Sequence, residues 1–318
     1  MKTYAFGCNL CKLLCPENNE LKRNEAKEAY ASWSLDEEER KSSSSGGIAS
    51  IFYAHFITEK NGIVFGCNYD ENLQLKFSSA TTLYELKKYK TSKYSQAYIG
   101  KTFKQVEKEL KNNKYVLFIG TPCQIAGLKS YLKKDYEKLL TIDLICHGVP
   151  SQKYLDDYVE SLNLPEKPDN LTFRGEHNFF FTLYKNNKII YSEKSNNDKF
   201  FDAFLQGLFY RKNCYSCNYA NSKRIGDITI GDFWGLGKEM PFNHSTENGV
   251  SLVLINNEKG DKFFNGIKDK IFFEKRPLKE AINGNDQLRH PTPKHQKHDL
   301  FLDIYIKNGI NKALNKTI

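Results

Sequence analysis

Two apolar runs of strand length in the centre of the chain constrain the fold more than any other feature. Residues 115–119 (Tyr-Val-Leu-Phe-Ile) and residues 139–145 are each followed by a turn rich in Gly or Pro, and then by apolar residues at helical spacing. A strand–turn–helix unit that repeats in this way is typical of a parallel sheet covered by helices. We therefore predict an α/β fold, and in such sheets ligands gather at the carboxyl ends of the strands.

The pattern changes at the proline-rich break of residues 164–169. Beyond it, short alternating strands flank an Asn186-Asn187 turn, and a helix leads to a Cys-x2-Cys pair. We predict an α/β domain over residues 42–165, with a mixed or parallel sheet and flanking helices. A smaller α+β C-terminal domain over residues 166–318 carries the Cys-x2-Cys pair.

The cysteines are grouped as metal ligands are. Cys123 and Cys146 lie in the two turns that follow the predicted central strands, and Cys214 and Cys217 form the downstream pair. In a chain that looks intracellular, thiols grouped in this way indicate a metal or cluster more than disulfides. The spacing alone leaves three alternatives: an iron–sulfur cluster, a zinc ion, or cysteines that bind nothing.

The first cysteines form a separate group near the start of the chain. Cys8, Cys11 and Cys15 match the last three cysteines of a bacterial ferredoxin segment, and a proline follows them as it does there. The position of the first cysteine is Ala5, and no second segment of this kind follows. We interpret residues 1–41 as a degenerate ferredoxin-like segment and linker, with a cluster that uses a borrowed ligand as the alternative.

Composition narrows the class of protein. The chain is 40% hydrophobic and 14% aromatic, which is enough for a packed core. Its net charge is +9, but no tract of five basic residues occurs, so we interpret the lysines as a solvated surface and predict no nucleic-acid partner. No apolar stretch reaches the roughly 18 residues that a membrane span needs. We therefore predict no membrane span and a location in the cytoplasm.

Two turns are suited to phosphate or flavin. Residues 43–47 combine serine hydroxyls with glycines at a predicted helix start, and residues 120–124 form a strand-to-helix turn. Taken singly, each turn is better explained as a capped helix or a tight turn. Asp227 and Asp232, which flank a predicted strand, are interpreted as solvent contacts, with groups that orient a flavin or the cluster loop as the alternative. Neither GxGxxG nor GxxxxGK[ST] occurs, which argues against ordinary nicotinamide or ATP enzymes.

Together these segments resemble one family, the beta subunit of coenzyme F-420 hydrogenase and dehydrogenase. The resemblance covers nearly the whole chain and is carried by residues 43–48, 63–66, 91–94, 120–128, 143–151, 214–220 and 226–233. It implies an iron–sulfur flavoprotein oxidoreductase with a 4Fe-4S cluster and FAD. Electrons would pass between a redox partner protein, ferredoxin-like or another oxidoreductase subunit, and an unknown small-molecule substrate.

The resemblance also assigns residues by position. It implies that the cluster ligands are Cys123, Cys146, Cys214 and Cys217. The residues that it places around FAD are Ser44, Ser45, Gly46, Gly47, Lys93, Gly120, Thr121 and Pro122. Lys93 and His147 are the predicted catalytic groups: Lys93 would stabilise a reduced anionic flavin, and His147 would donate a proton, although a lone His in a turn is often structural.

The short ferredoxin segment departs from the pattern of bacterial relatives, so the usual electron entry is in doubt. Those relatives often occur among surface-polysaccharide genes, which favours a sugar-linked or lipid-linked substrate. The alternative from a different class is a non-catalytic binding or scaffold protein stabilised by zinc.

Overall fold

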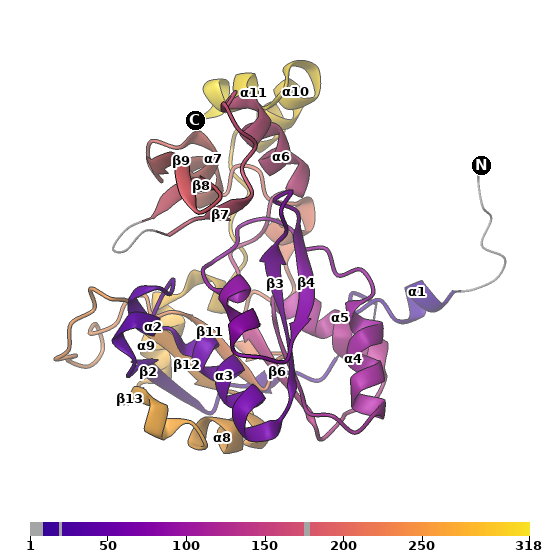
Figure 1. The fold of residues 1–318 in the computed structure, drawn as a ribbon, viewed down its shortest axis with the longest axis vertical. Helices are drawn as coiled ribbons and strands as arrows, with labels where there is room; N and C mark the ends of the chain where they lie inside the picture. Colours follow the sequence, from indigo (N-terminus) through magenta and orange to yellow (C-terminus); the bar gives the residue numbers. More distant parts are fainter. Residues whose placement is uncertain (1–8, 19–20, 175–178) are drawn as a thin grey trace.

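An eight-stranded mixed sheet is the main element of the computed structural model, which describes residues 9–18, 21–174 and 179–318 (Figure 1). The order of its strands is β13-β2-β12-β11-β6-β5-β3-β4. The strands are β2 (Glu28–Ser34), β3 (Ile63–Tyr69), β4 (Leu75–Ala80), β5 (Val116–Gly120), β6 (Leu139–Leu144), β11 (Ile228–Asp232), β12 (Ser251–Ile255) and β13 (Ile271–Arg276).

The centre of this sheet is parallel. Strand β3 pairs in parallel with β5, β5 with β6, and β6 with β11. Strand β12 is antiparallel to β11, and β2 is antiparallel to β12, so β2 runs in the same direction as the parallel strands. The carboxyl ends of β2, β11, β6, β5 and β3 therefore meet at one side of the sheet, which we call the carboxyl edge.

The side chains of β5 alternate between the two faces of the sheet, and helices cover both faces. Leu117 and Ile119 of β5 pack into one cluster with Phe residues of α3 (Ile48–Lys60) and α8 (Glu258–Asn265). Val116 and Phe118 point the other way and pack with α4 (Thr102–Lys111) and α5 (Pro122–Leu132). Since successive side chains of a strand face opposite sides, a continuous apolar run is buried on both faces. This confirms the predicted α/β fold with a mixed sheet and flanking helices.

A second lobe lies above the sheet lobe in Figure 1. Its small antiparallel sheet has the order β7-β8-β9 and consists of β7 (Asn170–Thr172), β8 (Phe180–Lys185) and β9 (Lys188–Lys194). Helices α6 (Gln152–Ser161), α7 (Lys199–Leu205), α10 (His298–Asn308) and α11 (Ile310–Thr317) complete it. We call it the aromatic lobe, because half of its core residues are Phe or Tyr. The predicted Asn186-Asn187 turn joins β8 to β9, and both residues have positive φ, as a tight hairpin requires.

Tyr94 connects the two lobes through contacts with the rings of Phe173, Phe201 and Phe204. Tyr94 leaves the sheet lobe and stacks on Phe204 in the core of the aromatic lobe, with ring centroids 4.4 Å apart. The eight-stranded sheet takes strands from each of the segments 1–41, 42–165 and 166–318, whose boundaries stay a prediction.

Short elements complete the described chain: α1 (Leu10–Leu13), β1 (Asn24–Glu25), α2 (Glu37–Lys41), η1 (Tyr84–Tyr89), η2 (Lys212–Ser216), β10 (Lys223–Arg224), η3 (Lys268–Lys270), α9 (Leu278–Gly284) and η4 (Asp286–Leu288). None of the helices in the described ranges has both the length and the hydropathy that a membrane crossing requires.

Candidate functional site

The cysteines predicted as ligands gather at the carboxyl edge. Cys123 lies in the first turn of α5, directly after β5, and Cys146 follows β6. Strands β5 and β6 are neighbours, with Gly120 opposite Asp143, so the two turns lie side by side. Cys214 lies in η2 and Cys217 directly follows it, so η2 brings both cysteines to the same part of this edge.

The four thiols influence one another's pKa. Burial is the main cause that raises the pKa of each of them. The charges of Cys123, Cys214 and Cys217 raise the pKa of Cys146 further. Likewise, Cys214 raises the pKa of Cys123, and Cys123 raises that of Cys217. Such coupling requires short distances between the sulfur atoms.

The site remains open to solvent although protein surrounds it. Cys123 is exposed, and the other three cysteines are partly exposed. Arg211 lowers the pKa of Cys123 and Cys214 and so opposes the effect of burial. A bound cation or cluster would stabilise the thiolates in the same sense, because thiolates are the form that ligates metals.

A buried ion pair fastens the Cys-x2-Cys region to the strand that precedes Cys146. Arg224 Nη2 lies 2.8 Å from Asp143 Oδ1, and the two side chains are 1% and 0% exposed. Arg224 also donates to the carbonyls of Tyr219 and Asn221, just after the cysteine pair, and to that of Leu144. The sequence analysis missed this pair, and the closeness of Arg224 to the cysteine pair was its only signal.

A single zinc ion and a 4Fe-4S cluster place different demands on four thiolate ligands. In the described ranges, no group of three or more His, Cys, Asp or Glu side chains is placed to hold a metal ion. One tetrahedral zinc would draw four sulfur atoms to within about 4 Å of one another, given Zn–S bonds of about 2.3 Å. In a 4Fe-4S cluster each cysteine binds a different iron, so the sulfur atoms stand farther apart.

The N-terminal cysteines cannot be assigned to this site. Cys8 and Ala5 lie outside the described residues, and so does the side chain of Cys11. Nearby, Glu17 Oε2 accepts a hydrogen bond from Asn218 Nδ2 at 2.8 Å, so the end of this segment contacts the residue that follows Cys217. Whether the segment binds a cluster stays a prediction.

The turn of residues 43–47, which we call the serine turn, lies farther along the same edge. Ser44 Oγ accepts a bond from Ser92 N at 2.7 Å, and Ser45 Oγ accepts one from Ser251 Oγ at 3.3 Å. Gly47 has a φ of 80° and is the N-cap of α3. A Cβ at Gly46 would lie 2.4 Å from the Ser32 carbonyl oxygen, so packing against the end of β2 accounts for this glycine.

Lys93 lies beside the serine turn, but its ammonium is already occupied. Lys93 Nζ donates to the carbonyls of Tyr89, Lys90 and Thr91 at 3.1, 2.7 and 2.9 Å. Burial lowers the pKa of Lys93 to about 8, and the charge of Cys67 opposes this effect. Contact with a flavin would require the ammonium to release at least one of these carbonyls, and its predicted role stays a prediction.

The turn of residues 120–122 is a helix cap. Thr121 and Gln124 form a reciprocal capping box at the start of α5, with Pro122 in its first turn. Thr121 Oγ1 also lies 3.2 Å from Cys123 Sγ. Three strands separate β5 from β2, so this turn and the serine turn are roughly 20 Å apart along the edge. Only an extended ligand could contact both.

His147 faces an acidic neighbour. Burial lowers its pKa, whereas Asp232 and Asp286 raise it. Asp232 in turn forms an ion pair with Arg174 of the aromatic lobe at 2.5 Å. The solvent-contact interpretation of Asp227 is wrong, because this side chain is buried and accepts bonds from the backbone and hydroxyl of Thr141.

Comparison with known proteins supports the resemblance. The family described as the C terminus of the coenzyme F420 hydrogenase/dehydrogenase beta subunit matches residues 113–281, a range that includes all four of these cysteines. A chain in the structure of the F420-reducing [NiFe] hydrogenase complex from Methanosarcina barkeri is similar in fold, with a TM-score of 0.56 and 20% identity. The similarity covers 92% of each chain. No curated protein matches the sequence.

Proposed function

This chain belongs to the coenzyme F420 hydrogenase/dehydrogenase beta subunit family, a family of oxidoreductase subunits, and from this premise we propose that it is an iron–sulfur flavoprotein. A 4Fe-4S cluster would be held by Cys123, Cys146, Cys214 and Cys217, and FAD by the serine turn and the residue 120–122 turn. The observation that carries the proposal is the convergence of four thiols from distant stretches of chain on one edge of the sheet.

When bound, the cluster supplies one-electron transfer and FAD connects one-electron with two-electron chemistry. The chain itself supplies the surroundings. Arg211 favours the thiolate form of Cys123 and Cys214, and the buried pair of Arg224 and Asp143 holds the two cysteine regions together. The amino terminus of α3, a 13-residue helix, offers backbone N–H groups to a pyrophosphate.

His147 is the proposed proton donor at this site. Its lowered pKa favours the neutral ring at neutral pH, and Asp232 is the group that would stabilise its protonated form. The substrate is a small molecule, and a sugar-linked or lipid-linked intermediate of surface-polysaccharide synthesis stays a prediction from the resemblance. A reducing compartment, the cytoplasm, suits the thiolate ligands.

The experiment that tests the cluster is metal and flavin analysis of protein purified without oxygen. We expect about four irons per chain, a broad visible absorbance and a bound flavin. Cys214→Ser should remove the iron, whereas Cys67→Ser is the matched control and should keep it, because Cys67 lies in β3 away from the group. A colourless protein that holds about one zinc would instead support the scaffold alternative.

The flavin site needs its own pair of variants. Ser44→Ala removes the acceptor that holds the Ser92 backbone, and we expect flavin to be lost while the iron remains. Ser42→Ala is the control, since its hydroxyl bonds to the carbonyl of Glu38 in α2. Equal flavin content in both variants would exclude the serine turn as the flavin site.

A further inference from the structure

Cys123 differs from the other three proposed ligands in the hydrogen bonds that its sulfur receives. Burial raises the pKa of Cys146, Cys214 and Cys217, and hydrogen bonds from backbone N–H groups oppose this rise. Cys123 also has a side-chain partner, because Thr121 Oγ1 lies 3.2 Å from its sulfur. Within the described ranges, no other side chain is hydrogen-bonded to one of these four sulfur atoms.

The chemistry of a metal ligand fixes the direction of this hydrogen bond. While the thiol is protonated, either atom could be the donor. A cysteine that binds iron is a thiolate, so its sulfur carries no proton. In the loaded protein the hydroxyl of Thr121 must therefore donate to the sulfur of Cys123. A hydrogen bond to an ionised acceptor is stronger than one between neutral groups.

The backbone holds the hydroxyl of Thr121 close to the sulfur. Thr121 is the N-cap of α5 and has extended backbone angles, with φ of −68° and ψ of 157°. Its N–H donates to Gln124 Oε1 at 2.8 Å. Pro122 follows, and its ring fixes φ at the next residue. Because Thr121 and Cys123 both belong to the start of α5, their contact does not depend on how the two lobes pack.

We propose that Thr121 is a positioning residue whose hydroxyl, acting through Cys123, raises the reduction potential of the 4Fe-4S cluster. This inference rests on the proposed function and adds the side chain that tunes it. Reduction adds one electron, which makes the thiolate sulfur atoms more negative, and no bond to the protein forms or breaks. A donor to sulfur stabilises the reduced form more than the oxidised form, and hydrogen bonds to the sulfur atoms are among the factors that set cluster potentials.

The test is a potentiometric titration of the full chain, purified without oxygen, in which EPR follows the reduced cluster. Thr121→Val removes the hydroxyl with little change of shape, whereas Thr121→Ser keeps it. We expect the equilibrium constant for reduction to fall at least about threefold in Thr121→Val, which corresponds to about 28 mV for one electron. The potential of Thr121→Ser should stay close to that of the parent protein.

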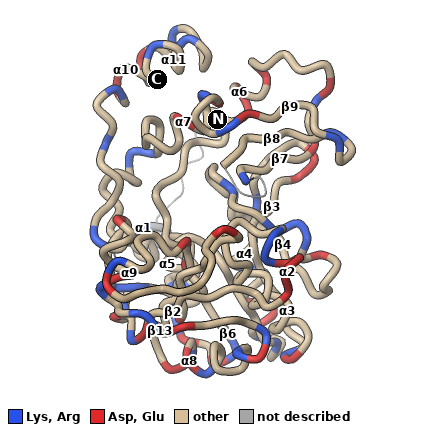
Figure 2. Tube along the Cα trace, turned by 90° about the vertical axis from the view of Figure 1, so that its left-hand side faces the viewer, with Lys and Arg blue, Asp and Glu red and all other residues tan. Residues whose placement is uncertain are grey.

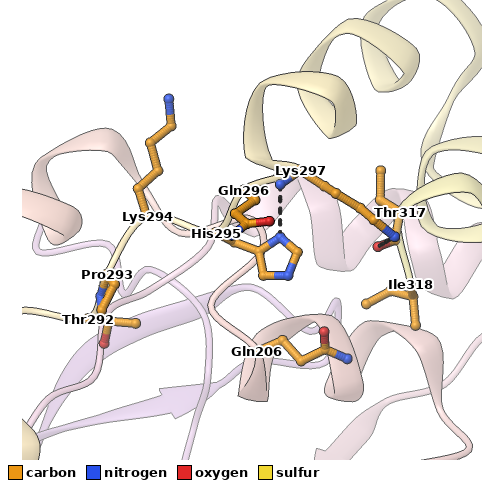
Figure 3. A pocket seen from close by; sticks show the side chains of 9 residues that line it. All are labelled: Gln206, Thr292, Pro293, Lys294, His295, Gln296, Lys297, Thr317 and Ile318. Atoms are coloured by element: carbon orange, nitrogen blue, oxygen red, sulfur yellow. Dashed lines mark hydrogen bonds between the residues drawn. The ribbon is translucent and has the colours of Figure 1, made fainter.

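The first control removes a threonine hydroxyl that does not contact sulfur. Thr292 lies in the connection that runs from α9 in the sheet lobe to α10 in the aromatic lobe (Figure 2). It lines a cavity of about 580 Å³ (Figure 3), and its hydroxyl donates to the carbonyl of His147, the residue after Cys146, at 2.6 Å. Thr292→Val should therefore leave the potential unchanged.

The second control separates the hydrogen bond to sulfur from the cap of α5. Gln124→Met removes the acceptor of the Thr121 N–H and keeps the Thr121 hydroxyl. We expect this variant to melt at a lower temperature because the capping box is lost, and to keep the potential of the parent protein. Equal shifts of the potential in Gln124→Met and Thr121→Val would trace the effect to the cap and overturn the inference.

Iron and flavin contents are measured together with each potential. Equal potentials in Thr121→Val and the parent protein would overturn this inference and leave the proposed function standing. Loss of flavin from Thr121→Val at an unchanged potential would assign the hydroxyl to the flavin and also overturn it. A parent protein without iron would remove the proposed function and this inference together. Thr121→Ala takes the place of Thr121→Val if the latter does not fold with about four irons.

Discussion

Replacing Arg224 with methionine tests whether the buried ion pair holds the two cysteine regions together. The change keeps much of the volume and removes the charge opposite Asp143, which is fully buried. Loss of one partner of a buried pair costs about 3–5 kcal/mol, because the other charge stays uncompensated. The carbonyls of Tyr219 and Asn221 also lose a donor.

Neutral donors reduce this cost without removing it. Asp143 still accepts from the backbone N–H groups of Ile225 and Gly226 at 3.2 and 2.7 Å and from the Thr229 hydroxyl at 2.7 Å. We therefore expect the lower end of the range, a fall of about 3 kcal/mol in the free energy of unfolding. This is a large share of the 5–15 kcal/mol that is usual for a folded protein.

Urea unfolding measures the effect through the shift of the midpoint at constant slope. Arg289→Met is the control, because Arg289 pairs with Asp286 at the surface and should cost less than about 1 kcal/mol. In the double variant Asp143→Asn/Arg224→Met no buried charge remains, so its cost should fall below the sum of the two single variants. A loss under about 1 kcal/mol in Arg224→Met, or strict additivity in the double variant, would refute the reasoning.

Three further predictions concern single positions. Since the pKa of Lys93 falls from 10.5 to about 8, the unfolded chain binds more protons between these values. The penalty for burying the ammonium is thus present below about pH 8 and fades toward pH 10.5. The free energy of unfolding of the parent protein, relative to that of Lys93→Met, should therefore rise with pH by at most about 3.5 kcal/mol. Gly148→Ala should lower the free energy of unfolding by at least about 2 kcal/mol, because φ is 134° there and a Cβ would lie 2.4 Å from the Tyr210 ring. The melting curve measures this loss, and a loss below about 2 kcal/mol would contradict the prediction. Gly46→Ala should reduce flavin retention, because a Cβ would force the serine turn away from β2.

The sequence predicted the parallel core because its signals are local. Residues 115–119 and 139–145 are apolar runs of strand length, and β5 and β6 lie within one residue of them. The convergence of Cys123 and Cys146 then followed from the rule that parallel strands end at one edge. The Cys-x2-Cys pair is also visible in the sequence, but no local pattern defines its place in space, and the resemblance assigned it to the same site.

Long-range partners explain what the sequence did not show. Strand β2 was assigned to a ferredoxin-like segment and linker, because Ala29 and Ala31 are small and give no strong apolar alternation. Only their pairing with β12 and β13 makes them core residues. Asp227 looked like a solvent contact for a similar reason: the Thr141 groups that it binds are 86 residues away in sequence.

The pairing of β2 also has a consequence for how the chain folds. Its neighbours β12 and β13 lie more than 200 residues later, so this strand remains without its hydrogen-bond partners until residues 251–276 have been synthesised. Contacts of such separation slow folding, and unpaired strand edges favour association with other chains. A chain whose translation stops before residue 251 would therefore leave three open edges, both edges of β2 and one of β11, for a chaperone to protect.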